Sequence, residues 1–180
     1  MKKLGLILIV VISTFSFSCK HTPTTEEALN CNKVIMDCTS DLDDTYSSFK
    51  DVWNEYDLDT YDASAYESLK SGLQTVKDKV TASLKTIESS NKEFEGIPEF
   101  TDFSNIAVEY YKALGSMCDN EYTEIISLIG KGDAFTGEDR DKCFANDSII
   151  TVKHKNACDK FINFQADFAS KFKFELEKKE

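Results

Sequence analysis

Residues 157–172 read ACDKFINFQADFASKF, and the apolar residues of this stretch decide the fold. They recur at spacings of four and three residues, which places them on one face of an α-helix. A stripe of aromatic side chains at this spacing is far more often part of a core than a ligand site. We therefore predict a helix from about Ser148 to Glu177. Its stripe consists of Ala157, Phe161, Phe164, Phe168, Phe172 and, one turn further on, Leu176.

Three earlier stretches show the same helical period, and we predict helices over about 26–56, 63–94 and 101–129. Thr24 or Thr25 is suited to cap the first of them, and Thr101 with Asp102 the third. The first stripe is Cys31, Ile35, Cys38, Leu42, Phe49, Val52 and Tyr56, with Thr45 in its one polar slot. The second is Leu69, Leu73, Val76, Val80, Leu84 and Ile87. The third is Phe103, Ile106, Tyr110, Leu114, Met117, Ile125 and Leu128.

The breaks between these helices are few, since the chain has 7 glycines and 2 prolines. Polar residues 57–62, the Gly96-Ile97-Pro98 segment and Gly130–Gly132 separate the stripes. Residues 133–147 form the longest irregular stretch, in which Thr136 is suited to cap a short helix. Four long amphipathic helices with short connections bury their apolar stripes most simply when they pack side by side. We predict an all-α, antiparallel up-down four-helix bundle over residues 26–180.

The N-terminus carries the pattern of an export signal. Lys2 and Lys3 precede an apolar run over Leu4–Ile12, which is too short for a membrane-spanning anchor. Ser18 is the small residue that a lipoprotein signal peptidase requires, and Ser16-Phe17-Ser18-Cys19 resembles a relaxed bacterial lipobox. We predict a signal peptide over residues 1–18, a lipidated Cys19 and a tether to residue 25. The alternative is an ordinary cleaved signal in which Cys19 is incidental.

Charge excludes one class of partner. The formal net charge is -11, and removal of Lys2 and Lys3 with the signal makes the mature chain more negative still. Such a surface repels phosphate backbones, so we expect no nucleic-acid partner. The partners that remain are the membrane, reached through the N-terminal lipid, and an unknown protein or small molecule.

Clusters of acidic residues suggest calcium binding, but their spacing does not match that of a calcium-binding loop. Neither Asp41, Asp43 and Asp44 nor Asp57-Leu58-Asp59 is followed by the glycine and glutamate of an EF-hand loop. The better candidate is the loop group of Asp133, Glu138, Asp139 and Asp141. We interpret these groups as solvated surface carboxylates, and we expect neither a metal site nor a cofactor.

No catalytic residue is assigned from the sequence. His154 and Cys158 stand at i and i+4, but no third group is evident to orient the histidine, which we expect to be exposed. Glu121 and Glu124 are expected to form a solvated helix edge, since nothing nearby would raise one pKa selectively.

The cysteines that follow Cys19 are the other candidate site residues. An exported protein meets oxidising conditions, so pairs should close where geometry allows. Two pairings rank first and nearly equal, Cys143–Cys158 and Cys118–Cys158, with Cys38–Cys118 third. The alternative is that all five remain reduced core residues, because several lie on or beside apolar stripes.

Ser148 is a candidate modification site. Asp147-Ser148-Ile149 fits the Asp-Ser/Thr-aliphatic pattern that some Bacteroidetes use for O-glycosylation. The motif is short, and modification requires that this segment is exposed.

The last third of the chain resembles a protein family. The similarity rests on Asn120-Glu121-Tyr122, Ile125-Ile126, Gly132-Asp133, Glu138-Asp139, Phe164-Gln165, Phe168-Ala169 and Phe174-Glu175-Leu176. On these residues the chain resembles the uncharacterised helical-bundle surface lipoproteins of Bacteroidetes and leptospires. The resemblance implies a helical bundle at the cell surface and carries no assigned activity; the extra cysteines depart from it.

These observations lead to an expected location and role. We expect a lipid-anchored protein of the bacterial cell envelope, at the outer membrane or cell surface, that acts as a non-enzymatic binding or structural module. The alternative is an envelope enzyme or a small-ligand carrier, with its site near residues 133–147 or in a cavity lined by the C-terminal phenylalanines. A pocket with converging polar groups would favour the enzyme over a non-enzymatic bundle whose stripes fill its own core.

Overall fold

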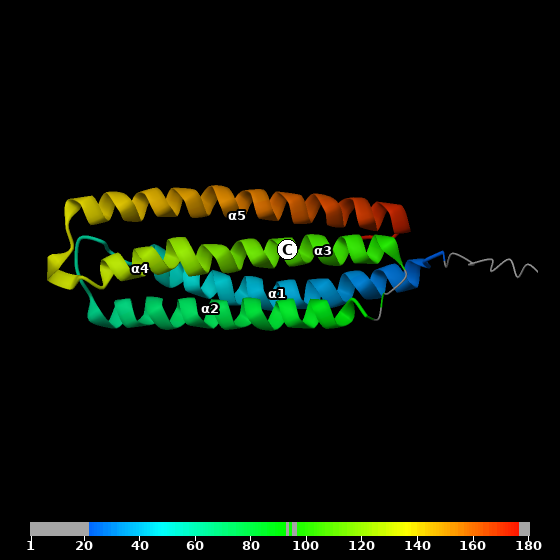
Figure 1. Cartoon of the computed structure of the whole chain (residues 1–180), viewed down its shortest axis with the longest axis horizontal. Helices are drawn as coiled ribbons and strands as arrows, with labels where there is room; N and C mark the ends of the chain where they lie inside the picture. Colours follow the sequence, from blue (N-terminus) through cyan, green and yellow to red (C-terminus); the bar gives the residue numbers. More distant parts are fainter. Residues whose placement is uncertain (1–21, 93, 95–96, 177–180) are drawn as a thin grey trace, which may run out of the picture.

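The protein folds into an up-down bundle of four helical rods, as the sequence predicts (Figure 1). The computed structural model describes residues 22–92, 94 and 97–176, and within these ranges every regular element is a helix. The residues up to 21, and with them the predicted signal peptide and Cys19, lie outside the described residues. The rods are α1 (Thr25–Glu55), α2 (Ala63–Ser90), the joined elements α3 (Pro98–Met117), a π-helical turn (Cys118–Tyr122) and α4 (Thr123–Ile129), and finally α5 (Gly137–Phe172).

Side-chain caps fix where three of these rods begin. Thr24 forms a capping box with Glu27: the Glu27 backbone N–H donates to the Thr24 hydroxyl over 3.2 Å, and the Thr24 N–H donates to Glu27 Oε2 over 2.8 Å. The Asp62 carboxylate accepts from the first N–H groups of α2. Thr136 and Asp139 form a second box at the start of α5. Each cap satisfies donors that have no partner inside the helix.

The third rod starts earlier than expected. It begins at Pro98, and Thr101 is not its cap, because the Thr101 hydroxyl donates to the Ile97 carbonyl instead. Proline suits the first helical position because its ring fixes a helical φ and the missing N–H would have no partner there. The π-helical turn then joins α3 to α4, so the two continue as one rod in Figure 1.

The fourth rod is shifted towards the N-terminus relative to the prediction. α5 begins at Gly137, so most of the stretch predicted to be irregular is helix, and it ends at Phe172. At its C-terminus Lys173 adopts a left-handed backbone with φ 60, and the Phe174 N–H donates to the Ala169 carbonyl. This is a common way to terminate a helix. Leu176 therefore lies beyond α5 and does not continue its stripe.

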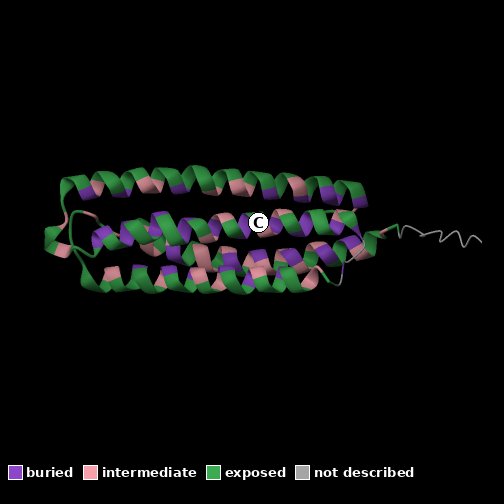
Figure 2. Ribbon diagram, viewed as in Figure 1, coloured by how far each residue is buried: buried purple, intermediate pink, exposed green. Residues whose placement is uncertain are grey.

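The core is aromatic at the end of the bundle where α1 begins and α5 ends. Phe103 is fully buried and its ring centroid lies 4.7 Å from that of Phe168 and 5.9 Å from that of Phe161. Phe100 contacts Phe168 and Phe172 edge-on. Figure 2 shows buried residues on the inward faces of the rods and exposed residues on the outside of α5 and α2. The predicted phenylalanine stripe is therefore core.

Buried hydroxyl pairs cross the core between α1 and the third rod. The oxygens of Thr39 and Tyr111 lie 2.8 Å apart, and those of Tyr46 and Tyr122 lie 2.7 Å apart. The sequence placed Thr45 in the polar slot of the first stripe, but Thr39 is the buried threonine. Because each hydroxyl has a partner on the facing rod, these pairs fix the register of the two parallel rods.

Candidate functional site

A cavity opens at the end of the bundle opposite to Thr25, which we call the distal end. Its volume is about 260 Å³, and it lies between the loop after α1 and the connection from α4 to α5. We call it the distal cavity. Its walls are Tyr56, Leu58, Asp59, Tyr61, Ile129, Gly132, Asp133, Phe135, Thr136, Gly137 and Arg140. The part contributed by residues 132–140 falls in the stretch where the sequence placed an alternative site.

Two glycines allow the loops around the distal cavity to approach closely. A Cβ on Gly130 would lie 2.7 Å from the Tyr66 hydroxyl, which leaves no room for a side chain. Gly132 has φ +55, and its Cα faces the ring of Tyr61. The Phe135 N–H then donates to the Gly132 carbonyl, which closes the turn that leads into α5. Glycine is the residue that tolerates this backbone without strain.

Charged groups at the distal cavity are mostly paired. Arg140 forms an ion pair with Asp59, and Lys142 with Glu138 one helical turn away. Asp133 is exposed and forms no ion pair with the other described residues. Two carboxylates and one guanidinium therefore face the cavity, together with the rings of three aromatic residues.

Asp139 closes the base of this region and is almost fully buried. It accepts hydrogen bonds from Lys131 Nζ over 2.6 Å, from the Thr136 N–H over 3.0 Å and from the Thr136 hydroxyl over 2.9 Å. The Lys131 ammonium and these donors lower the pKa of Asp139 to about 2. Of the acidic group predicted from the sequence, Asp139 and Glu138 are thus paired with different lysines. Across the described residues, no three metal-binding side chains gather at one point.

The depressed pKa of Asp139 predicts how stability depends on pH. The folded state holds the ionised form more tightly than the unfolded chain does, so this stabilisation is present above about pH 4. It is lost as pH falls towards about 2, where the folded Asp139 is protonated. We expect the urea concentration at the unfolding midpoint to fall less steeply in Asp139→Asn than in the wild type as the pH is lowered from about 4 to about 2. The exposed neighbour variant Asp141→Asn serves as the control, and equal slopes for Asp139→Asn and the wild type would contradict the assignment.

His154 and Cys158 lie in the seam between α1 and α5, and the prediction that His154 is exposed is wrong. The His154 ring is half-buried against Tyr46, with ring centroids 5.1 Å apart, and its Nε2 lies 3.6 Å from Cys158 Sγ. Burial lowers the pKa of His154 and raises the pKa of Cys158. Both shifts favour neutral forms, so this pair lacks the thiolate that a cysteine nucleophile requires.

All five described cysteines are free thiols in the structure. The predicted Cys143–Cys158 bridge is wrong, because both residues lie on α5 and fifteen residues of helix separate them by about 22 Å. Burial raises the pKa of Cys143 to about 11.

The other two predicted bridges are not formed either. Glu121 pairs with Lys153 and Tyr110 contacts Cys158, which places Cys118 about one helical turn from the level of Cys158. The hydroxyl pair of Thr39 and Tyr111 likewise places Cys118 more than one turn from Cys38. Cys118 is fully buried, and burial raises its pKa to about 12. The oxidation state of these thiols after the predicted export stays a prediction.

Ser148 is exposed on the outer part of α5, so the condition for its modification is met. Its hydroxyl donates to the Phe144 carbonyl over 2.9 Å, and the motif lies within a helix rather than in a loop. Glycosylation of Ser148 stays a prediction.

Sequence reasoning missed the aromatic and arginine walls of the distal cavity. In the sequence, Tyr56 is the last residue of the first predicted stripe. Tyr61 lies in the polar segment that follows it and is predicted to be a loop residue. Arg140 carried a clearer signal, since it is the single arginine of the chain. Arginine is favoured over lysine where a planar set of donors must meet a carboxylate.

Comparison of the chain with protein-family models, with curated proteins and with solved structures finds no significant match. In the described part of the chain, none of the helices combines the length and the apolar character that crossing a bilayer demands.

Proposed function

We propose that this protein is a lipid-anchored module of the bacterial cell envelope that presents the distal cavity, away from the membrane, to a small ligand. The observation that carries the proposal is the position of this cavity at the end of the bundle opposite to Thr25. Cys19 precedes Thr25 by six residues, which span at most about 20 Å. Because α1 has 31 residues, it separates that end from the distal cavity by about 46 Å.

The walls of the distal cavity suit recognition. Aromatic rings offer flat apolar surface, while Arg140, Asp59 and Asp133 offer groups that orient a polar ligand. At about 260 Å³ the cavity is slightly smaller than pockets for drug-sized molecules, so we propose a compact ligand with one flat apolar side. A kinship with the surface lipoproteins of Bacteroidetes and leptospires stays part of this proposal.

The alternative functions have less support. An enzyme needs an activated group, and burial lowers the pKa of His154 and raises the pKa of Cys158, which favours the unactivated, neutral form of each. A carrier with a cavity among the C-terminal phenylalanines is not supported, because Phe161, Phe164 and Phe168 all lie against the ring of Phe103.

Filling the distal cavity tests the proposal. Gly137 lines the distal cavity and a Cβ added there meets no atom within 4 Å, so Gly137→Phe is expected to occupy part of the cavity without disturbing the fold. Small molecules that raise the unfolding temperature of the wild type should fail to raise that of Gly137→Phe. At a ligand concentration of about 100 times Kd the wild type should gain about 2.7 kcal/mol of stability.

The matched control is Ala145→Phe, which adds the same ring at an exposed position of α5. It should respond to each ligand as the wild type does. A ligand that stabilises the wild type and Gly137→Phe to the same extent does not bind in the distal cavity. If every stabilising ligand gives this result, the proposal is wrong.

A further inference from the structure

A second concavity lies beside the π-helical turn, between that turn, α4 and α5, and has no part in the distal cavity. Its volume is about 440 Å³, and it is lined by Asp119, Asn120, Glu121, Thr123, Glu124, Ser127, Leu128 and Asn146. Lys77 of α2 already pairs with Asp119 and donates to the Thr123 hydroxyl. We call it the π-turn groove. No aromatic residue lines it, and its polar groups are carboxylates, amides and hydroxyls.

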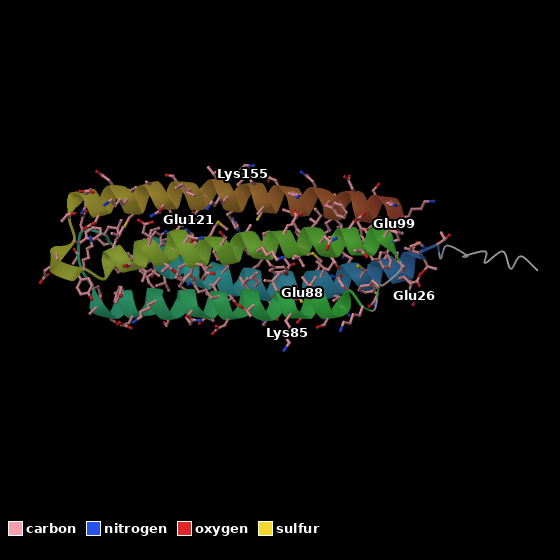
Figure 3. All side chains as sticks on the ribbon, in the orientation of Figure 1. Glu26, Lys85, Glu88, Glu99, Glu121 and Lys155 are labelled. Atoms are coloured by element: carbon pink, nitrogen blue, oxygen red, sulfur yellow. The ribbon has the colours of Figure 1, made fainter. Side chains whose placement is uncertain are left out.

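Glu121 distinguishes this groove from an ordinary acidic surface. Its residue exposure is 9 %, which corrects the expectation that Glu121 forms a solvated edge with Glu124. Lys153 of α5 donates to Oε1, whereas Oε2 is buried with no donor among the described residues. Figure 3 places Glu121 on the side of its rod that faces α5. A buried carboxylate oxygen without a hydrogen-bond donor lowers stability by about 1–3 kcal/mol. A cation that binds this oxygen removes that penalty.

The lysine that binds Glu121 lies outside the π-turn groove. Lys153 lines a different groove, between α3 and α5, together with Lys160. Glu121 itself belongs to the π-helical turn Cys118–Tyr122 and also lines the π-turn groove. π-helical turns of this kind occur frequently at functional sites.

Two other residues that line the groove, Asn120 and Glu124, carry acceptor oxygens. The Asn120 amide donates through Nδ2 to the carbonyl and the hydroxyl of Ser116, so its side-chain oxygen remains an acceptor. Glu124 stands three residues after Glu121, which makes the two carboxylates neighbours on one helix face. The net charge of -11 raises the local concentration of cations around the protein.

The chemistry of the lining selects one class of cation. A quaternary ammonium is recognised by aromatic faces, and the groove has none. Among the described residues, no three histidine, cysteine, aspartate or glutamate side chains gather closely enough to hold a metal ion. A primary ammonium carries three donors and no acceptor, which matches a set of carboxylate and amide oxygens. We propose that the π-turn groove binds the ammonium group of a linear primary amine through Glu121, Glu124 and Asn120.

Titration calorimetry of the purified protein with 1,4-diaminobutane tests this inference. We expect saturable binding to the wild type, and Glu121→Gln should weaken it at least tenfold, since a neutral amide replaces the carboxylate. Tetramethylammonium should show no binding. Glu138→Gln is the matched control, because it removes an exposed acid that is paired with Lys142 on α5 away from this groove. Gly137→Phe should also leave amine binding unchanged, which separates this site from the distal cavity.

A second variant keeps the test decisive if Glu121→Gln does not fold. Lys153→Met removes the cation on Oε1 and leaves both oxygens of Glu121 without a lysine partner. 1,4-Diaminobutane should then raise the unfolding temperature of Lys153→Met more than that of the wild type. The proposal is overturned if the two proteins show equal shifts in unfolding temperature, or if Glu121→Gln binds the amine as tightly as the wild type does. Binding of Ca²⁺ that is tighter than binding of the amine and also depends on Glu121 would overturn it as well.

Discussion

Replacing Phe103 by alanine is expected to lower the free energy of unfolding by about 3–5 kcal/mol. Phe103 is fully buried, and its ring centroid lies within 6 Å of the rings of Phe161, Phe164 and Phe168 of α5. Truncation removes apolar contacts and leaves a cavity between two rods. The neighbouring backbones are long continuous helices, so the cavity cannot close by a local shift, and the loss should fall in the upper half of this range.

Urea unfolding followed by far-UV circular dichroism measures this loss. The control is Ile162→Ala, which changes a residue next to Phe161 that is 57% exposed on α5. A substitution at such a position is expected to change stability by less than about 0.5 kcal/mol. If Phe103→Ala costs less than about 1 kcal/mol, α3 and α5 do not share the aromatic core described above.

The four rods could be predicted because their buried stripes are long and regular. Phe161, Phe168 and Phe172 repeat with helical period, and the same holds for Leu69 to Ile87 on α2. Breaks in this chain are few, so each stripe ends at an identifiable polar or glycine-containing segment. Short connections then leave antiparallel packing as the simplest way to bury all four stripes.

The start of α5 could not be placed from the pattern of apolar residues. Between Gly137 and Ser148, the helix buries Asp139 and Cys143, and only one of these is apolar. A period of 3.6 cannot be recognised from a single apolar residue. The stronger signal was the box of Thr136 with Asp139, in which aspartate takes the place that glutamate usually occupies.

The buried polar groups depend on partners that lie far away in the chain. Tyr111 bonds to Thr39 and Glu121 to Lys153, and nothing in the sequence near Glu121 indicates that lysine. The distal cavity has the same origin, because Tyr61 and Arg140 belong to different connections that meet only at one end of the bundle. Its walls therefore could not be assigned before the register of the rods was known.

Replacing Cys19 by alanine is expected to abolish stable membrane association. In the proposed protein, signal peptidase cleaves before Cys19 after a lipid is attached to its thiol, so the alanine variant should remain an unprocessed or mislocalised precursor. The physical reason lies in the number of acyl chains. One chain of myristoyl length binds a bilayer only marginally, whereas the two or three chains on a lipoprotein cysteine anchor it stably.

Fractionation of cells that produce the wild type and Cys19→Ala measures this effect, and mass spectrometry of the N-terminal peptide identifies the lipid. A matched control is Cys31→Ala, which alters the first buried cysteine of α1 and should fractionate with the membrane as the wild type does. Because a net charge of -11 repels anionic lipid headgroups, the bundle itself should supply no membrane affinity, and the lipid carries the whole of it. A Cys19→Ala protein that is processed and remains in the membrane fraction would refute the lipoprotein proposal and leave the distal cavity without a defined orientation to the membrane.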